Sequence, residues 1–264
     1  MSPLPLIFGA AAALCVLFAL VYGLARAIDN YGIVDIAWSY SFAGIAAYYA
    51  LLGGGFPARR AVIAAMAAAW SLRLGTHLLN RIAAKHPIED GRYAQLRRDW
   101  GPGFATKMAG FFELQAASVV ILAIPFLAAC TDPRPSLRPL EWAAAALWAA
   151  AIGGEALADA QLSAFKRDPL RAGGVCEEGL WRYSRHPNYF FEWLVWVSFF
   201  LFGCASPWGW AGILSPACIL FLLLRVTGIP ATEEQSLRSK GAAYRSYQER
   251  TSAFVPLPRR TPIR

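Results

Sequence analysis

The sequence predicts an all-α integral membrane protein with seven transmembrane helices, the N-terminus outside and the C-terminus in the cytoplasm. Three observations support this fold class. The chain is 57% hydrophobic and only 16% charged, it contains seven apolar stretches, and its basic residues are distributed unevenly among the loops. A soluble domain typically has about a quarter of its residues charged.

Each apolar stretch approaches the length of about 20 residues that crosses ~30 Å of hydrocarbon as a helix. The expected spans lie near residues 5–25, 33–52, 61–79, 111–130, 141–157, 189–204 and 207–226. No basic residue precedes the first stretch, and no cleavage pattern of small residues follows a short apolar region there. We therefore expect a retained helix rather than a signal peptide.

The basic residues predict the orientation. With seven spans, one side of the membrane receives Arg59, Arg60, Arg134 and Arg138, Arg73 lies within a span, and the rest of the 25 basic residues fall on the other side. Basic residues favour the cytoplasmic side. We therefore expect a protein of the bacterial inner membrane whose long polar loops, and hence its functional site, face the cytoplasm.

No internal repeat or low-complexity linker divides the chain, which predicts a single membrane-embedded domain over residues 1–264 with a cytoplasmic tail, 227–264. Within the tail, TEEQSLRSKGAAYRSYQER has helical spacing, and its acidic start complements the helix dipole. An amphipathic helix on the membrane surface would explain this segment equally well. The five cysteines show no CxxC or Cys/His spacing, so we expect neither disulfides nor a metal site.

The stretch RYSRHPNYFFEWLVW, residues 182–196, contains several polar residues at the start of an expected span. Pro187 suits the first turn of a helix, which places Arg185 and His186 at its positive end, where an anion binds favourably. Asn188 and Glu192 are four residues apart and share a face. A carboxylate within a span is costly, so Glu192 has a ligand or a partner. A structural Glu–Arg pair is the alternative.

Polar residues also follow one face of the third expected span. Trp70, Arg73, His77, Asn80 and Arg81 recur every three or four residues. Arg73 and His77 lie deep enough in the span to require an inward-facing cavity. The fifth span has Glu155 and Asp159 four residues apart, with Lys166 after them.

In the second span, Asp35 lies about one turn from the start. Desolvation there favours the neutral acid, which can donate a proton. The alternative is a helix-start carboxylate that interacts with the helix dipole. The chain has no Walker loop, GxGxxG, HExxH or GxSxG motif. Any nucleotide is therefore held by helices and loops, and the surplus of arginine favours a ligand with several phosphates.

The stretch GLWRYSRHPNYFFEW, the polar RLGTHLLNR and the tail segment YRSYQERTSAFVPLP together resemble the steroid 5α-reductase family, in particular its bacterial DUF1295-type members. The likeness covers most of the chain after about residue 30. It implies a seven-helix, NADPH-dependent reductase of an enone. The family's cofactor contacts fall on Arg73, Arg81, Asp159, Lys166, Asn188, Tyr189, Glu192 and Tyr247, and on Glu155, where the family commonly has an amide. With Arg185 and His186 from the start of the span and Arg245 from the tail, these residues other than Glu155 form the expected cofactor-binding set.

Two positions depart from the family. Its eukaryotic members polarise the substrate ketone with a Glu in the second helix and a Tyr in the third, whereas this chain offers Asp35 and has Trp70 in the tyrosine's place. Asp35 is therefore the first candidate for the catalytic acid, and Tyr40 and Tyr93 are the reserves. We expect a flat apolar enone, such as a 3-oxo-Δ4 steroid, to enter from the membrane lipids into a pocket lined by the first helices. No nucleic-acid partner is expected.

Two other functions remain open. RHPxY followed by Glu233 and Glu234 is also similar to isoprenylcysteine carboxyl methyltransferases and phospholipid methyltransferases, whose ligand is S-adenosylmethionine. A transporter is the third reading, since Arg73, Asp35 and Glu192 could line a path through the membrane. No inverted repeat or pair of broken helices supports transport.

Overall fold

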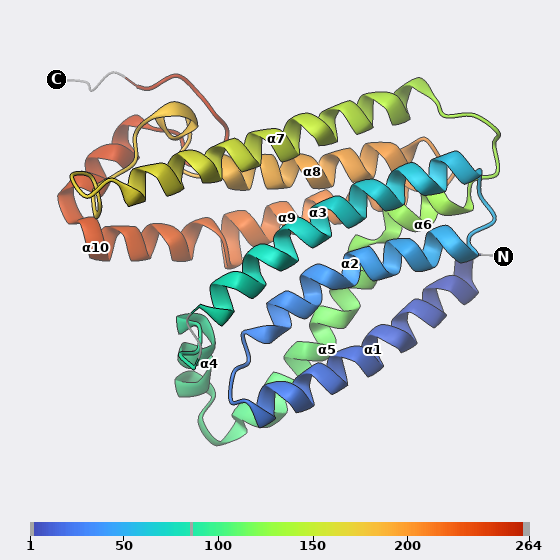
Figure 1. Cartoon of the computed structure of the whole chain (residues 1–264), viewed down its shortest axis with the longest axis horizontal. Helices are drawn as coiled ribbons and strands as arrows, with labels where there is room; N and C mark the ends of the chain where they lie inside the picture. Colours follow the sequence, from blue (N-terminus) through green and yellow to red (C-terminus); the bar gives the residue numbers. More distant parts are fainter. Residues whose placement is uncertain (1–2, 85–86, 261–264) are drawn as a thin grey trace. The chain divides into compact units, whose positions relative to one another are not determined.

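The computed structural model describes residues 3–84 and 87–260, and every named element in these ranges is helical (Figure 1). The elements in chain order are α1 (Pro3–Ala27), α2 (Ile33–Leu52), α3 (Pro57–Ala83), α4 (Gly91–Trp100), η1 (Gly101–Gly103), α5 (Phe104–Leu122), α6 (Ile124–Thr131), α7 (Pro139–Arg167), η2 (Gly179–Arg182), α8 (Pro187–Cys204), η3 (Gly209–Ile213), α9 (Leu214–Phe221), η4 (Leu222–Val226) and α10 (Ile229–Arg250). The all-α prediction is confirmed.

Four helical runs are long and apolar enough to cross a membrane by length and composition: Pro3–Ala27, Pro57–Ala83, Gly91–Thr131 and Gly209–Arg250. The apolar part of the last run precedes α10, which is rich in charged residues. The chain therefore has the helices of a membrane protein.

Two expected spans are interrupted rather than continuous. The stretch 111–130 divides into α5 and α6 at Ala123, because Pro125 lies in the first turn of α6 and has no N–H to continue the α5 hydrogen bonds. The stretch 207–226 consists of η3, α9 and the π-helix η4.

The helices group into two compact units, and each is described by itself. Unit 1 comprises Met1–Glu141 with Phe202–Gly212, and unit 2 comprises Trp142–Leu201 with Ile213–Arg264.

An aromatic cluster forms the core of unit 1 where α2 packs along α3. The Phe42 ring meets Trp38 edge-on at 4.7 Å between centroids and Trp70 at 5.4 Å. Trp70 is fully buried. Gly75 lets α3 approach closely, because a Cβ there would lie 2.6 Å from the Tyr40 ring. Trp70 therefore packs in the core of unit 1.

Arg59, at the start of α3, is fully buried and closes a polar network in unit 1. Its guanidinium pairs with the buried carboxylate of Glu141 and donates to the carbonyl oxygens of Asp132, at 3.0 Å, and Arg134, at 2.9 Å. A buried charge needs such full pairing. The network thus holds the start of α3 to the segment that connects α6 and α7.

In unit 2, the chain after α10 returns to the segment that precedes α8. Arg185 N–H donates to Ser252 O at 2.8 Å, Leu257 N–H donates to Tyr183 O at 2.9 Å, and Ser184 Oγ donates to Phe254 O at 2.7 Å. Helices α7 and α8 also pack closely in unit 2. Gly154 allows this, because a Cβ there would lie 2.4 Å from the Phe191 ring.

Candidate functional site

The candidate site lies in unit 2 at the start of α8. Helix α8 begins at Pro187, whose missing N–H costs nothing in a first turn. Ser184 Oγ accepts the N–H of His186 at 3.1 Å, and this contact orients the two residues before the proline. His186 is buried, with 2% of its surface exposed.

Arg185 connects α8 to α10. Its Nε lies 2.5 Å from Oε1 of Glu233, and one of its terminal nitrogens donates to the carbonyl oxygens of Gln248, at 2.9 Å, and Thr251. We expected this guanidinium to bind cofactor phosphates. In the structure its donors serve contacts within the protein instead.

Glu233 is the acceptor at the centre of this network. Besides Arg185, His186 Nε2 lies 3.3 Å from Oε1, and Gln248 Nε2 donates to Oε2 at 3.0 Å. Burial by itself raises the pKa of Glu233, but the hydrogen bonds and charges of His186 and Arg185 outweigh it and lower the pKa from 4.5 to about 2. Glu233 is thus a carboxylate at neutral pH.

Asn188 and Tyr189 extend the cluster across three helices. Asn188 Nδ2 donates to Asp159 Oδ1 of α7 at 3.2 Å. Thr232 of α10 donates to Gly228 O at 2.9 Å, so the Tyr189 hydroxyl, 3.2 Å from Thr232 Oγ1, is the donor in that contact. The predicted residues from α7 and α8 therefore do come together, and they meet α10.

Glu192 has a partner on its own helix, as Trp196 Nε1 donates to Glu192 Oε1 at 2.9 Å. The rings of His186 and Tyr189 stack, with 5.4 Å between centroids and 6° between planes. Glu192 and His186, both predicted to bind the cofactor, thus also contact aromatic side chains close to them in the sequence.

Tyr247, expected to contact the cofactor, is buried, and its hydroxyl donates to Trp181 O, with Ser184 O at 3.2 Å. Burial raises the pKa of Tyr247 well above its usual value. This hydroxyl holds the loop that precedes α8.

Lys166 and Arg245 have exposed side chains in unit 2. Lys240 of α10 is close enough to Lys166 for the two charges to repel. Burial lowers the pKa of Lys240, and the neighbouring charge of Lys166 lowers it further. An anion between these two ammonium groups would relieve that repulsion.

In unit 1, two of the three catalytic candidates form one pair. Tyr93 is 1% exposed, and its hydroxyl donates to Asp35 Oδ1 at 2.8 Å. Arg92 donates to Asp35 Oδ2 at 2.6 Å. We expected Asp35 to be the proton donor. Here it accepts two hydrogen bonds, and Tyr93 carries the proton.

Burial, followed by the charge of Asp35, raises the pKa of Tyr93 well above its usual value, so this phenol stays protonated at neutral pH. Tyr40 is the remaining candidate, and its hydroxyl lies 3.0 Å from Thr76 Oγ1. Of the two basic residues predicted on α3, Arg73 is half-buried, and Arg81 pairs with Asp90 at 3.2 Å.

Several residues of these clusters were not predicted. Thr232, Lys240 and Gln248 were missed, and Glu233 was singled out only for the methyltransferase alternative. Glu233 follows His186 by 47 residues, so no local spacing could pair the two. The one signal that could have linked Glu233 to His186 was the similarity of RHPxY, followed by Glu233 and Glu234, to methyltransferases.

Comparisons with known proteins identify relatives of uncharacterized activity. Residues 21–251 match the family described as "Protein of unknown function (DUF1295)". An uncharacterized protein of Schizosaccharomyces pombe, C594.04c, is 26% identical over 266 aligned positions, which cover 89% of this chain and 75% of the relative. No solved structure matches the chain.

Proposed function

The chain belongs to the DUF1295 family, and we propose that it is a membrane reductase of the steroid 5α-reductase type. In this proposal it uses NADPH to reduce the C=C bond of an apolar enone, such as a 3-oxo-Δ4 steroid. Seven spans with the N-terminus outside, in the bacterial inner membrane, place the cofactor residues on the cytoplasmic side. The polar cluster that joins α7, α8 and α10 around Asn188 is the observation that carries the proposal.

The donor set of unit 2 fits NADPH. Lys166, Lys240 and Arg245 are cations that suit phosphates, and Lys166 and Lys240 repel each other without an anion between them. Asp159 and Asn188 offer an acceptor and a donor of the kind that bind ribose hydroxyls and a carboxamide. When bound, NADPH supplies a hydride.

In the proposal, a residue of unit 1 is the acid that polarises the carbonyl group of the enone. An enone that receives a hydride at its β-carbon develops negative charge on the carbonyl oxygen. In the proposal, the Tyr93 hydroxyl, which keeps its proton and donates a hydrogen bond to Asp35 in the free protein, turns that one hydrogen bond to the substrate oxygen. Asp35 and Arg92 orient the phenol and fix its position.

A methyltransferase is the main alternative. It would use Glu233 and Glu234 as free acids near the positively charged sulfonium of S-adenosylmethionine. Arg185 and His186 already engage Glu233, and Arg238 pairs with Glu234 at 2.5 Å. The Glu234 pair is exposed, so the engagement of Glu233 within the protein is what favours the phosphate-rich cofactor.

The test combines cofactor binding with turnover. Purified protein should gain thermal stability with NADPH and not with S-adenosylmethionine, by about 2.7 kcal/mol at a concentration of 100 times Kd. With NADPH and a membrane lipid extract or a 3-oxo-Δ4 steroid, mass spectrometry should detect a product heavier by two hydrogens.

Variants connect the result to the site. Asn188→Ala and Glu192→Gln should weaken NADPH binding about tenfold while the fold is retained, because Asn188 belongs to the cluster and Glu192 lies one turn further along the same face of α8. Ser239→Ala, an exposed change on α10, is the control. A thermal shift with S-adenosylmethionine alone would favour the methyltransferase. Cofactor-independent flux in proteoliposomes would favour a transporter.

A further inference from the structure

Two exposed cations flank one contact between α1 and α5 in unit 1. The two helices pack side by side (Figure 1), and the Tyr22 hydroxyl of α1 donates to Ala105 O of α5 at 2.7 Å. Arg26 lies one turn after Tyr22, and Lys107 lies two residues after Ala105. Both side chains are exposed. The hydrogen bond therefore brings together the helix turns that carry the two cations.

Each cation lies over an aromatic ring. The guanidinium carbon of Arg26 is 5.9 Å from the centroid of the Tyr22 ring, and Lys107 Nζ is 5.9 Å from the centroid of the Trp100 ring. Tyr and Trp concentrate where the headgroups of a membrane meet its hydrocarbon. The rings thus indicate that the two cations lie at the level of the lipid headgroups.

The acids near these cations are bonded to other arginines. The ion pairs are those of Arg97 with Asp29 and Glu89, of Arg92 with Asp35, and of Arg81 with Asp90. Arg98 and Asp99, at the end of α4, both bond to Gln95, and their charges offset each other. Within residues 3–84 and 87–260, Arg26 and Lys107 form no ion pair.

The position of Lys107 adds to the positive charge. It lies at the beginning of α5, whose first turn contains no acid and whose preceding residue, Gly103, offers no side-chain cap. A cation is unfavourable at this end of a helix unless an anion is near. Guanidinium and ammonium groups form their strongest hydrogen bonds with phosphate and carboxylate oxygens. The pair of cations therefore suits a phosphate group.

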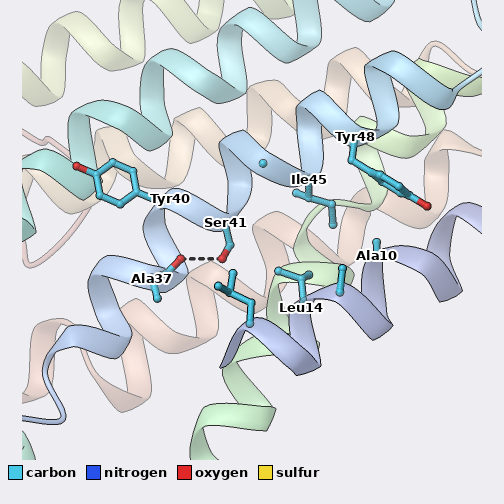
Figure 2. A pocket seen from close by; sticks show the side chains of 10 residues that line it. Ala10, Leu14, Ala37, Tyr40, Ser41, Ile45 and Tyr48 are labelled. Carbon is cyan, nitrogen blue, oxygen red and sulfur yellow. Dashed lines mark hydrogen bonds between the residues drawn. The ribbon is translucent and has the colours of Figure 1, made fainter. Parts of the chain in front are cut away.

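The surface of α1 next to Arg26 is apolar. Ala10 and Leu14 line a pocket against α2 and are buried (Figure 2), whereas Leu20 and Leu24 are 68% and 54% exposed. These two leucines are four residues apart and share a face in the turns that lead to Arg26. In a membrane they meet acyl chains. A ligand that satisfies both surfaces has an anionic head and a hydrocarbon tail.

We propose that the ends of α1 and α5 bind one anionic phospholipid. Arg26 and Lys107 hold its phosphodiester, and one acyl chain lies along Leu20 and Leu24. A zwitterionic headgroup also carries a positive charge, which the same cations repel, so a headgroup with net negative charge, such as phosphatidylglycerol, is selected. The site contains none of the residues proposed to bind NADPH or to polarise the enone, and the inference does not depend on the proposed function.

Native mass spectrometry of delipidated protein in detergent tests the site, with phosphatidylglycerol and phosphatidylcholine of identical acyl chains as the probes. One phosphatidylglycerol should bind about tenfold more tightly than phosphatidylcholine, because each basic side chain near an anionic headgroup contributes to binding. The variant Arg26→Gln/Lys107→Gln should bind the two lipids equally. Arg26→Lys/Lys107→Arg, which keeps both charges, should retain the preference.

The matched control is Arg167→Gln/Arg182→Gln, which removes two exposed cations from unit 2 and the same total charge. It should bind phosphatidylglycerol like the original protein. Because all four arginine and lysine side chains are exposed, the variants should keep the original midpoint of thermal unfolding in detergent without added lipid.

Three outcomes overturn the proposal. The first is equal affinity of the original protein for the two lipids, and the second is a preference that survives in Arg26→Gln/Lys107→Gln. The third is loss of the preference in the unit 2 control, which would assign it to net charge. Glycerophosphoglycerol, the same headgroup without acyl chains, should not displace the bound lipid at millimolar concentration. Complete displacement would assign the site to a soluble phosphodiester instead.

Discussion

Arg185 and Glu233 form an ion pair, with 2.5 Å between Nε and Oε1, that joins the residue before α8 to α10. The side chains are 10% and 16% exposed. The pair is thus largely withdrawn from water, and His186 and Gln248 contribute further hydrogen bonds to the same carboxylate.

Glu233→Gln should destabilise the protein by roughly 2–4 kcal/mol, because it leaves the mostly buried Arg185 guanidinium without its charge partner. The midpoint of thermal unfolding in detergent should fall by several degrees. Glu234→Gln is the matched control, since the pair of Glu234 with Arg238 is 64% and 77% exposed and contributes little. Equal midpoints for the two variants would contradict a structural role for Glu233.

The same carboxylate should make stability depend on pH. Its pKa in the folded protein, about 2, is below the ordinary value of 4.5, so its contribution is complete above pH 4.5 and is lost as the pH falls toward 2. Unfolding midpoints measured through this window should converge for the original protein and Glu233→Gln. If the two midpoints differed by the same amount at every pH, the ionisation of Glu233 would not be the cause of the difference in stability.

Tyr93→Phe should reduce turnover about 10²–10⁴-fold, because it removes the proposed donor to the developing oxyanion. Stability should fall by about 1 kcal/mol through loss of the hydrogen bond to Asp35. The thermal shift with NADPH should be unchanged. Tyr183→Phe, at a side chain that is 45% exposed, is the control. Full turnover by Tyr93→Phe would leave Tyr40 and Asp35 as the candidates.

Arg59→Met should destabilise the protein by about 3–5 kcal/mol, because it leaves the buried carboxylate of Glu141 without its charge partner. The double variant Arg59→Met/Glu141→Leu should recover part of this loss, since it removes both charges. Denaturant or thermal unfolding of both variants gives the comparison. A double variant less stable than Arg59→Met would show that the carboxylate contributes without its partner.

Elements with a strong local signal were predictable. The apolar stretches became helices, Pro187 begins α8, and the spacing of the tail predicted α10. Breaks within the expected helices were harder to predict. The break at Ala123 depends on Pro125, but the sequence on both sides of Pro125 is apolar and therefore reads as one continuous span. Gly241, inside α10, has a φ of 53° that no helical spacing signals.

The sequence by itself determined the helical class, the apolar helices of a membrane protein and the polar character of the α8 start, because helical periodicity and hydropathy act between near neighbours. Only the tertiary structure decided which polar groups are free. Arg185 and Tyr247 were expected to contact a ligand, and both are engaged within the protein. Their partners lie 48 and 66 residues away in the sequence. Helical periodicity relates only near neighbours, so it could not predict which of these distant residues would meet.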